Sequence, residues 1–183
     1  RPLEFHNGKP NLLFVGRLQE RKKLDVLLYA CSSLPSHLQP DLVIVGDGPD
    51  RQRLEQLAQT VYPATKFAGA RHGVELESYF ASADLFVLPG TGGLAVQQAM
   101  AHALPVLVGE ADGTQADLVR PENGWIVPAV NADSLAAKLA TALADVALLR
   151  QMGASSYRIV HDEVNLETMV QVFLNAIEAV LWN

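Results

Sequence analysis

The chain has 183 residues, of which 49 % are hydrophobic and 19 % are charged, and its formal net charge is -6. This length and composition suit one domain with a well-buried interior, and the acidic balance argues against a general affinity for nucleic acids or anionic membranes. A single cysteine, Cys31, excludes an internal disulfide, and the histidines lie far apart without metal-ligand spacing. The sequence shows no run of membrane-spanning length and no secretory signal, which predicts a cytoplasmic protein.

Short apolar runs alternate with helical patterns along the first half of the chain. Three runs that each end in glycine predict buried strands: 11–16, 41–46 and 66–69. A helix is expected after each run. The first begins at Leu24 and is closed by Pro35, the second has Asp50 as its N-cap, and the third lies around Val74–Phe80.

The stretch Leu85–Val108 is the most informative part of the sequence. The apolar residues Leu85–Leu88 predict a strand covered on both faces, and a turn containing Gly90, Gly92 and Gly93 follows it. A helix and a second buried strand complete the stretch. Because glycines let a ligand approach the backbone and a helix start presents free N–H groups, this corner suits an anion such as phosphate. A tight turn that simply requires glycine explains the same residues equally well, since a short glycine cluster is a weak motif.

The rest of the chain is predicted to be mostly helical. The expected elements are a loop, a helical turn, a short strand and a long helix: 109–114, 115–119, 125–127 and 131–149. Either Asn131 or Asp133 caps the long helix, and helical sequence continues through Tyr157.

The final helix, 165–182, carries an apolar stripe. Its members recur at helical spacing: Leu166, Met169, Val170, Phe173, Ile177, Val180 and Leu181. We expect this stripe to dock onto the core of the domain, with a partner interface as the alternative.

Strands that alternate with helices predict a parallel α/β sheet whose ligand-binding loops gather at the carboxyl edge. The loop after the first strand contains Arg17 and Lys22. If this loop faces the Gly90–Gly93 turn, two cations and a helix start surround one site suited to a diphosphate. A solvated basic loop is an equally weighted alternative. Asp47 is expected to cap a turn, and Glu110 and Asp112 to be solvated, with sugar contact as their alternative role.

Six motifs carry a resemblance to a known family: Val15–Leu18 with Lys22, Val45–Pro49, Phe67–Gly69, Ala83–Pro89, Gly93–Val106 and Glu122–Gly124. In this order and spacing they resemble the C-terminal domain of the retaining GT-B glycosyltransferases of family 4, the glycosyl transferases group 1. The resemblance covers about 11–128. It implies a single Rossmann-like, three-layer α/β domain with a parallel sheet and C-terminal helices, which is one half of a GT-B fold. Residues 1–183, including helix 165–182, are then the donor-binding domain, and the N-terminal acceptor lobe, which the family's last helix often reaches, is absent.

The resemblance also implies what these motifs bind. Arg17 and Lys22 match the family's catalytic cations, which contact the donor diphosphate and stabilise it as it leaves. The substrate-binding positions carried over are Gly16, Gly48, Ala70, Arg71, Gly90, Thr91, Gly92, Gly93, Leu94, Ala95 and Gln98. The implied donor is UDP-glucose or a close relative, and the implied acceptor is a saccharide or a lipid-linked molecule of polysaccharide biosynthesis. The family works without a cofactor or a metal, and this chain has no Asp-x-Asp pair.

Two positions depart from the family pattern. Where the family has two glutamates eight positions apart, this chain has Gly90 and Gln98. An amide can still hydrogen-bond a ribose, but Gly90 cannot replace a carboxylate, so sugar recognition must come from Thr91, from backbone groups or from the loop 109–114. The leading prediction is the donor-binding domain of a hexosyltransferase that is inactive without its other lobe. The alternatives are a non-catalytic module with a degenerate sugar clamp and an unrelated doubly wound domain.

The partners implied by the resemblance are UDP or a UDP-sugar and the absent N-terminal lobe, with no nucleic acid. Contact with the inner face of a membrane is expected only through that lobe.

Overall fold

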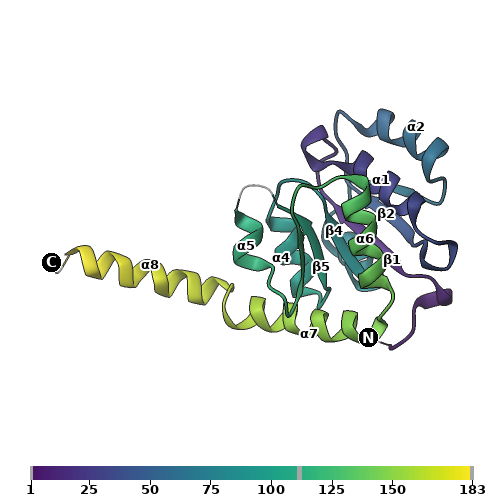
Figure 1. Ribbon diagram of the computed structural model, residues 1–183. Coiled ribbons are helices and arrows are strands. Elements are labelled where there is room, and N and C mark those ends of the chain that lie inside the picture. Colours follow the sequence, from purple (N-terminus) through teal and green to yellow (C-terminus); the bar gives the residue numbers. More distant parts are fainter. Residues whose placement is uncertain (1, 111–112, 182–183) are drawn as a thin grey trace.

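Six parallel strands form the central sheet of the computed structural model, which describes residues 2–110 and 113–181 (Figure 1). The strands are β1 (Asn11–Val15), β2 (Asp41–Val45), β3 (Lys66–Gly69), β4 (Leu85–Leu88), β5 (Val106–Gly109) and β6 (Gly124–Val127). Their order is β3-β2-β1-β4-β5-β6, and every neighbouring pair is parallel. All predicted strands are confirmed to within a residue or two at their ends.

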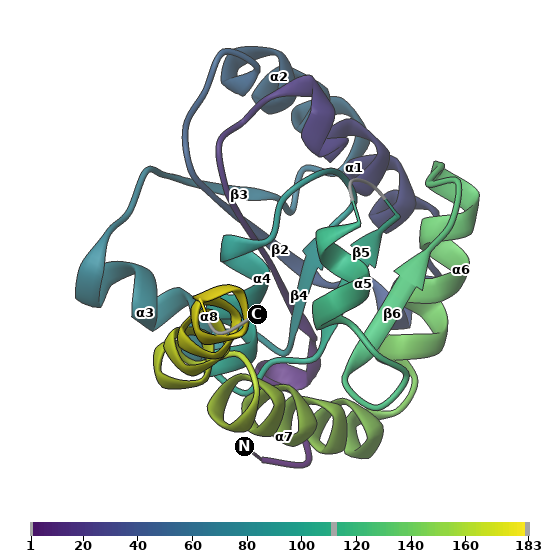
Figure 2. The same cartoon turned by 90° about the vertical axis from the view of Figure 1, so that its left-hand side faces the viewer.

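Helices cover both faces of this sheet. They are α1 (Leu24–Ser33), α2 (Arg51–Val61), α3 (Gly73–Ser82), α4 (Leu94–Ala101), α5 (Thr114–Leu118), α6 (Ala132–Leu143), α7 (Val146–Asp162) and α8 (Leu166–Leu181), with short 3-10 turns η1 (His6–Gly8), η2 (Glu20–Lys22) and η3 (Ser36–Leu38). Helix α1 packs against α2 and α6, whereas α4 packs against α5 and α7 (Figure 2). This three-layer arrangement is the predicted Rossmann-like α/β fold.

The strands are apolar after their first residues because the helices exclude water from both faces. Every residue of β4 and β5 is buried, and the three central residues of β1 are at most 1 % exposed. The free thiol of Cys31 on α1 also lies in this core, and burial raises its pKa to about 12.

An ion pair in the interior ties the N-terminal segment to the sheet. Arg150 on α7 contacts the Asp84 carboxylate at 2.7 Å, and their side chains are 10 % and 8 % exposed. Asp84 accepts the Asn11 N–H at the start of β1 (2.8 Å), while the Arg150 Nε donates to the Pro2 carbonyl (2.6 Å). The pair therefore joins α7, β1 and the chain start at the amino edge of the sheet.

Two helix-end predictions change. Asp50 stands before α2, but its backbone is already helical and its side chain makes no capping hydrogen bond, because its carboxylate contacts Arg53 instead. The helix expected to reach Leu149 is two helices, since Asp145 accepts the Leu148 N–H at 2.9 Å and starts α7. Asn131 is the cap of α6, in a reciprocal capping box with Ser134.

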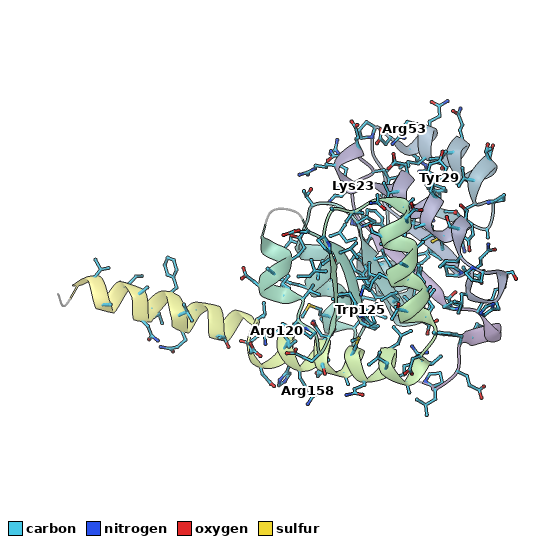
Figure 3. The ribbon with its side chains drawn as sticks, in the orientation of Figure 1. Lys23, Tyr29, Arg53, Arg120, Trp125 and Arg158 are labelled. Atoms are coloured by element: carbon cyan, nitrogen blue, oxygen red, sulfur yellow. The ribbon has the colours of Figure 1, made fainter. Side chains whose placement is uncertain are left out.

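Helix α8 is an arm rather than part of the domain, and the prediction that its apolar stripe docks onto the core is wrong for the stripe members whose side chains the structure describes, Val170, Phe173, Ile177 and Val180. The side chains of Leu166, Met169 and Leu181 lie outside that description. It extends away from the end of α7 (Figures 1 and 2), and the side chains drawn on its outer part stand clear of the sheet domain (Figure 3). Phe173 is 70 % exposed and Val180 is 80 % exposed. Just before the arm, Arg120 pairs with Glu163 at 2.6 Å, which lowers the pKa of that carboxyl group. Among the described helices, none combines the length and the apolar character needed to cross a bilayer.

Candidate functional site: a hollow at the carboxyl edge

The sheet reverses its winding direction between β1 and β4. The chain proceeds from β1 outward to β2 and β3, and then returns to place β4 on the other side of β1. The loops leaving β1 and β4 consequently diverge to opposite faces and leave a crevice beyond the strand ends, which is where open α/β sheets bind ligands.

A hollow of about 230 Å³ occupies this crevice. It is lined by residues from the end of β1, the turn η2, the end of β4 and the start of α4: Val15, Gly16, Lys22, Leu88, Gly92, Gly93, Leu94 and Ala95. Of these lining residues, Lys22 is the one with a charged side chain, and it brings a positive charge to the hollow. The start of α4 adds free N–H groups and the positive end of the helix dipole.

Lys22 is held directly against the glycine-rich loop, Pro89–Gly93. Its ammonium group donates a hydrogen bond to the Thr91 carbonyl oxygen. A Cβ atom added at Gly92 would lie 2.7 Å from the Lys22 Nζ and would displace the ammonium group, and the φ of 141° at this position also favours glycine.

The loop and the turn η2 touch through their backbones. A Cβ atom at Gly90 would lie 2.0 Å from the Arg21 carbonyl oxygen and 2.7 Å from the Lys22 Cα. The Thr91 N–H also donates to that Arg21 carbonyl at 3.3 Å. Gly90 is buried in this contact, so no side chain of any kind fits at the position where the family has a carboxylate. The predicted loss of the carboxylate clamp therefore has a steric cause in this chain.

The structure brings six of the predicted site residues together around the hollow: Gly16, Lys22, Gly92, Gly93, Leu94 and Ala95. Thr91 and Gly90 form the backbone support behind them. Arg17 follows Gly16 directly but is exposed and does not line the hollow, and Gln98 is exposed on α4.

The remaining predicted residues lie on the β2 and β3 side of the edge. Gly48 packs against the Leu18 backbone, where an added Cβ would meet the Leu18 carbonyl oxygen at 2.2 Å. Gly46 makes the same kind of contact with the Gly16 carbonyl oxygen, at 1.9 Å. Ala70 is exposed after β3, and Arg71 bonds Glu75 on α3 at 3.3 Å. Ala70 and Arg71 stay predictions for binding the base, and Gly48 stays a prediction for binding the substrate.

Asp47 is engaged in the turn after β2. It accepts the Gly48 N–H at 2.7 Å and contacts Arg51 at 3.0 Å. These two interactions lower the pKa of its carboxyl group. The predicted turn-capping role is the one that the structure supports. Glu110 is exposed, and Asp112 lies outside the described residues.

Sequence reasoning missed one residue at this site. Gln115, in the first turn of α5, is 1 % exposed and donates its amide hydrogen to the Gly92 carbonyl oxygen at 3.0 Å. No motif marks it, and a lone glutamine in a single helical turn carries no periodicity signal.

A doubly wound parallel sheet with a cationic, glycine-lined hollow at its switch point defines a Rossmann-like domain with a site for an anionic, phosphate-bearing ligand. The family model "Glycosyl transferases group 1" matches residues 1–158. The chain belongs to this family.

Known proteins of this kind are similar along much of the chain. A GDP-mannose-dependent alpha-mannosyltransferase of Mycobacterium tuberculosis is 42 % identical over 126 residues, which are 67 % of this chain and 31 % of the relative. The structure of sucrose-phosphate synthase from Thermosynechococcus elongatus aligns with a TM-score of 0.80 and 28 % identity, covering 98 % of this chain and 47 % of that one.

Anabaena Alr3699/HepE, solved in complex with UDP and glucose, shares the fold at a TM-score of 0.80 and 18 % identity, over 94 % of this chain and 49 % of its own. The chain thus spans less than half the length of each of these proteins. The neighbours in structure are GT-B glycosyltransferases, and this fold is one lobe of that architecture.

Proposed function

We propose that this chain is the donor-binding domain of a retaining glycosyltransferase and that the hollow holds the diphosphate of a nucleotide sugar. The observation that carries the proposal is the meeting of Lys22 with the Gly92–Ala95 backbone at the switch point of the sheet. A diphosphate requires this combination of a point charge and several N–H donors.

The same groups suit the chemistry of glycosyl transfer. The bond that breaks joins the sugar C1 atom to a phosphate oxygen, and the leaving nucleoside diphosphate gains negative charge. Lys22 and the N-terminus of α4 stabilise that charge because they are fixed in place before the reaction. Arg17, exposed beside Gly16, supplies a second cation when its flexible side chain turns toward the phosphates.

GDP-mannose is the donor that the relatives favour, since the M. tuberculosis protein is named for it. UDP-glucose, expected from the family resemblance, is the second candidate, and it is supported by fold neighbours solved with UDP. We further propose that a second lobe supplies the acceptor site and any contact with a membrane surface.

Calorimetric titration of the chain tests donor binding. We expect heat with GDP or UDP and with the matching nucleotide sugar, GDP-mannose or UDP-glucose. Lys22→Ala is expected to weaken diphosphate binding by about tenfold to a hundredfold, because one charge-assisted contact is lost, while guanosine or uridine binding stays unchanged. Lys66→Ala is the matched control, since Lys66 is an exposed lysine at the start of β3 and so lies at the amino edge of the sheet, opposite to the hollow. The absence of heat with every nucleoside diphosphate rejects the proposal.

Arg17→Ala separates a phosphate contact from a solvated loop. We expect it to weaken diphosphate binding much more than nucleoside binding, and equal losses for both ligands would mean that Arg17 does not meet the phosphates.

A non-catalytic binding module is the second candidate function, favoured by the absence of a side chain at Gly90. Transfer assays on the two-lobed protein decide between the two: sugar transfer supports the enzyme, and donor binding without transfer supports the module.

A further inference from the structure

Gln115 is buried beside the hollow, and only one of the two polar atoms of its side-chain amide forms a hydrogen bond. Its Nε2 atom donates to the Gly92 carbonyl oxygen at 3.0 Å, and the residue is 1 % exposed. Its Oε1 atom is buried and accepts no hydrogen bond from the residues that the structure describes. The contact joins α5, which follows β5, to the glycine-rich loop, which follows β4.

Keeping a half-satisfied amide in the interior is unfavourable. A buried polar atom without a partner destabilises a fold, whereas an apolar side chain of the same shape does not. Leu118 and Val119, three and four positions further on, are both buried and apolar. An amide at Gln115 is therefore explained by its one hydrogen bond to the loop rather than by packing.

That hydrogen bond sets the direction of a peptide group. In a trans peptide the carbonyl and the following N–H point in opposite directions. Because the Gly92 carbonyl is directed toward Gln115, the Gly93 N–H points away from α5, and both glycines line the hollow. The N–H groups of Gly92 and Gly93 donate no hydrogen bond to another described residue.

The neighbouring carbonyls are held as well. The Lys22 ammonium group donates to the Thr91 carbonyl oxygen, and the Gln97 N–H donates to the Gly93 carbonyl at 3.0 Å. Three successive carbonyls thus point into protein contacts, and the middle one depends on Gln115. Without that contact the glycine-flanked peptide is free to rotate, since glycine resists rotation least.

We propose that Gln115 is a positioning residue for the donor: it holds the Gly92–Gly93 peptide so that the Gly93 N–H faces the diphosphate or the sugar hydroxyl beside it. This inference rests on the proposed function. It names a neutral group, distant in sequence from the motifs of the site, as the element that keeps the loop ready for its ligand.

The test is Gln115→Met, which keeps the size of the side chain and removes the amide. Calorimetry with GDP and UDP is compared with guanosine and uridine, and Gln151→Met on the exposed face of α7 is the matched control. We expect diphosphate binding to weaken about tenfold, nucleoside binding to stay unchanged and the urea midpoint to stay near the parent value, because the unpartnered oxygen is also removed.

Gln115→Glu is a second variant that also covers the case in which Gln115→Met does not fold. Its carboxylate cannot donate to the Gly92 carbonyl at pH 8. At pH 5 the protonated acid can, because burial at this position raises the pKa of a carboxyl group. We expect diphosphate affinity, divided by that of the parent at the same pH, to be low at pH 8 and to recover at pH 5. A purely structural role for Gln115 predicts no such recovery.

The outcomes separate the two proposals. A parent chain that binds neither GDP nor UDP overturns the proposed function and this inference with it. The role of Gln115 alone is overturned if the parent binds a nucleoside diphosphate and the variants bind it as tightly as the parent does. It is also overturned if the variants lose affinity for the nucleoside and for the diphosphate to the same extent.

Discussion

Replacing Gly90 with alanine is expected to destabilise the domain and to weaken nucleotide binding together. The added Cβ would lie 2.0 Å from the Arg21 carbonyl oxygen and 2.7 Å from the Lys22 Cα, and both are backbone atoms. Because backbone cannot turn aside as a flexible side chain does, the turn η2 must retreat from the loop by about 1 Å to restore ordinary contact. Lys22 moves with it and leaves the Thr91 carbonyl.

The magnitude follows from these two losses. Crowding of a well-packed interior costs about 1–3 kcal/mol. Opening the contact also lengthens the hydrogen bond from the Thr91 N–H to the Arg21 carbonyl, now 3.3 Å, which is worth about 1 kcal/mol. A total of about 3 kcal/mol corresponds to a fall in the melting temperature of about 6–12 °C for a domain of this size.

Urea unfolding and calorimetry with GDP and UDP measure both effects. Gly8→Ala is the control, because Gly8 has open space around its missing Cβ, so the added methyl group meets no neighbour and only backbone strain at its φ of 72° is added. Gly90→Glu is expected to behave like Gly90→Ala or worse, rather than to restore a sugar clamp. A Gly90→Ala protein with the stability and affinity of the parent would refute the steric reasoning.

Three further predictions concern the rest of the chain. Arg150→Met leaves the buried Asp84 carboxylate without its cation and is expected to cost about 3–5 kcal/mol in urea unfolding, whereas Asp84→Asn with Arg150→Met costs less than the sum of the single changes; additive effects would contradict this. The Cys31 thiol, whose pKa is raised to about 12, is expected to react with a disulfide reagent at pH 8 only after unfolding, and rapid native labelling would contradict its burial. Chymotrypsin is expected to cleave first near Phe173 on the arm, because a helix of this length without tertiary contacts is marginally stable; initial cleavage within the sheet domain, seen by mass spectrometry, would oppose it.

The sheet could be predicted from sequence because its strands are mostly apolar and a glycine ends or directly follows β1, β2 and β3. The meeting of the loops that follow β1 and β4 could be predicted from topology, since loops at the carboxyl edge of parallel strands converge. Lys22 and Gly92 were found in this way, and they meet in the structure.

Other features depend on contacts that sequence patterns do not encode. An apolar stripe such as that of α8 indicates a surface to be covered but does not name what covers it. The Asp50 side chain has the right chemistry for a cap, but the backbone enters α2 in a helical conformation that turns it toward Arg53. Gly90 was interpreted as a lost carboxylate, and only the position of the Arg21 carbonyl shows why no side chain fits.

The backbone contacts at the carboxyl edge limit how the proposed donor preference of this domain can be changed in the laboratory. A Cβ added at Gly46, Gly48 or Gly90 would lie 2.2 Å or less from a neighbouring carbonyl oxygen. We therefore expect a mutant library that randomises these positions to consist mostly of misfolded clones. Leu94, 81 % exposed on the rim of the hollow, and Gln98, exposed one turn further along α4, carry no such restriction. Selection for new sugar nucleotides should therefore diversify these two positions and leave the glycines untouched.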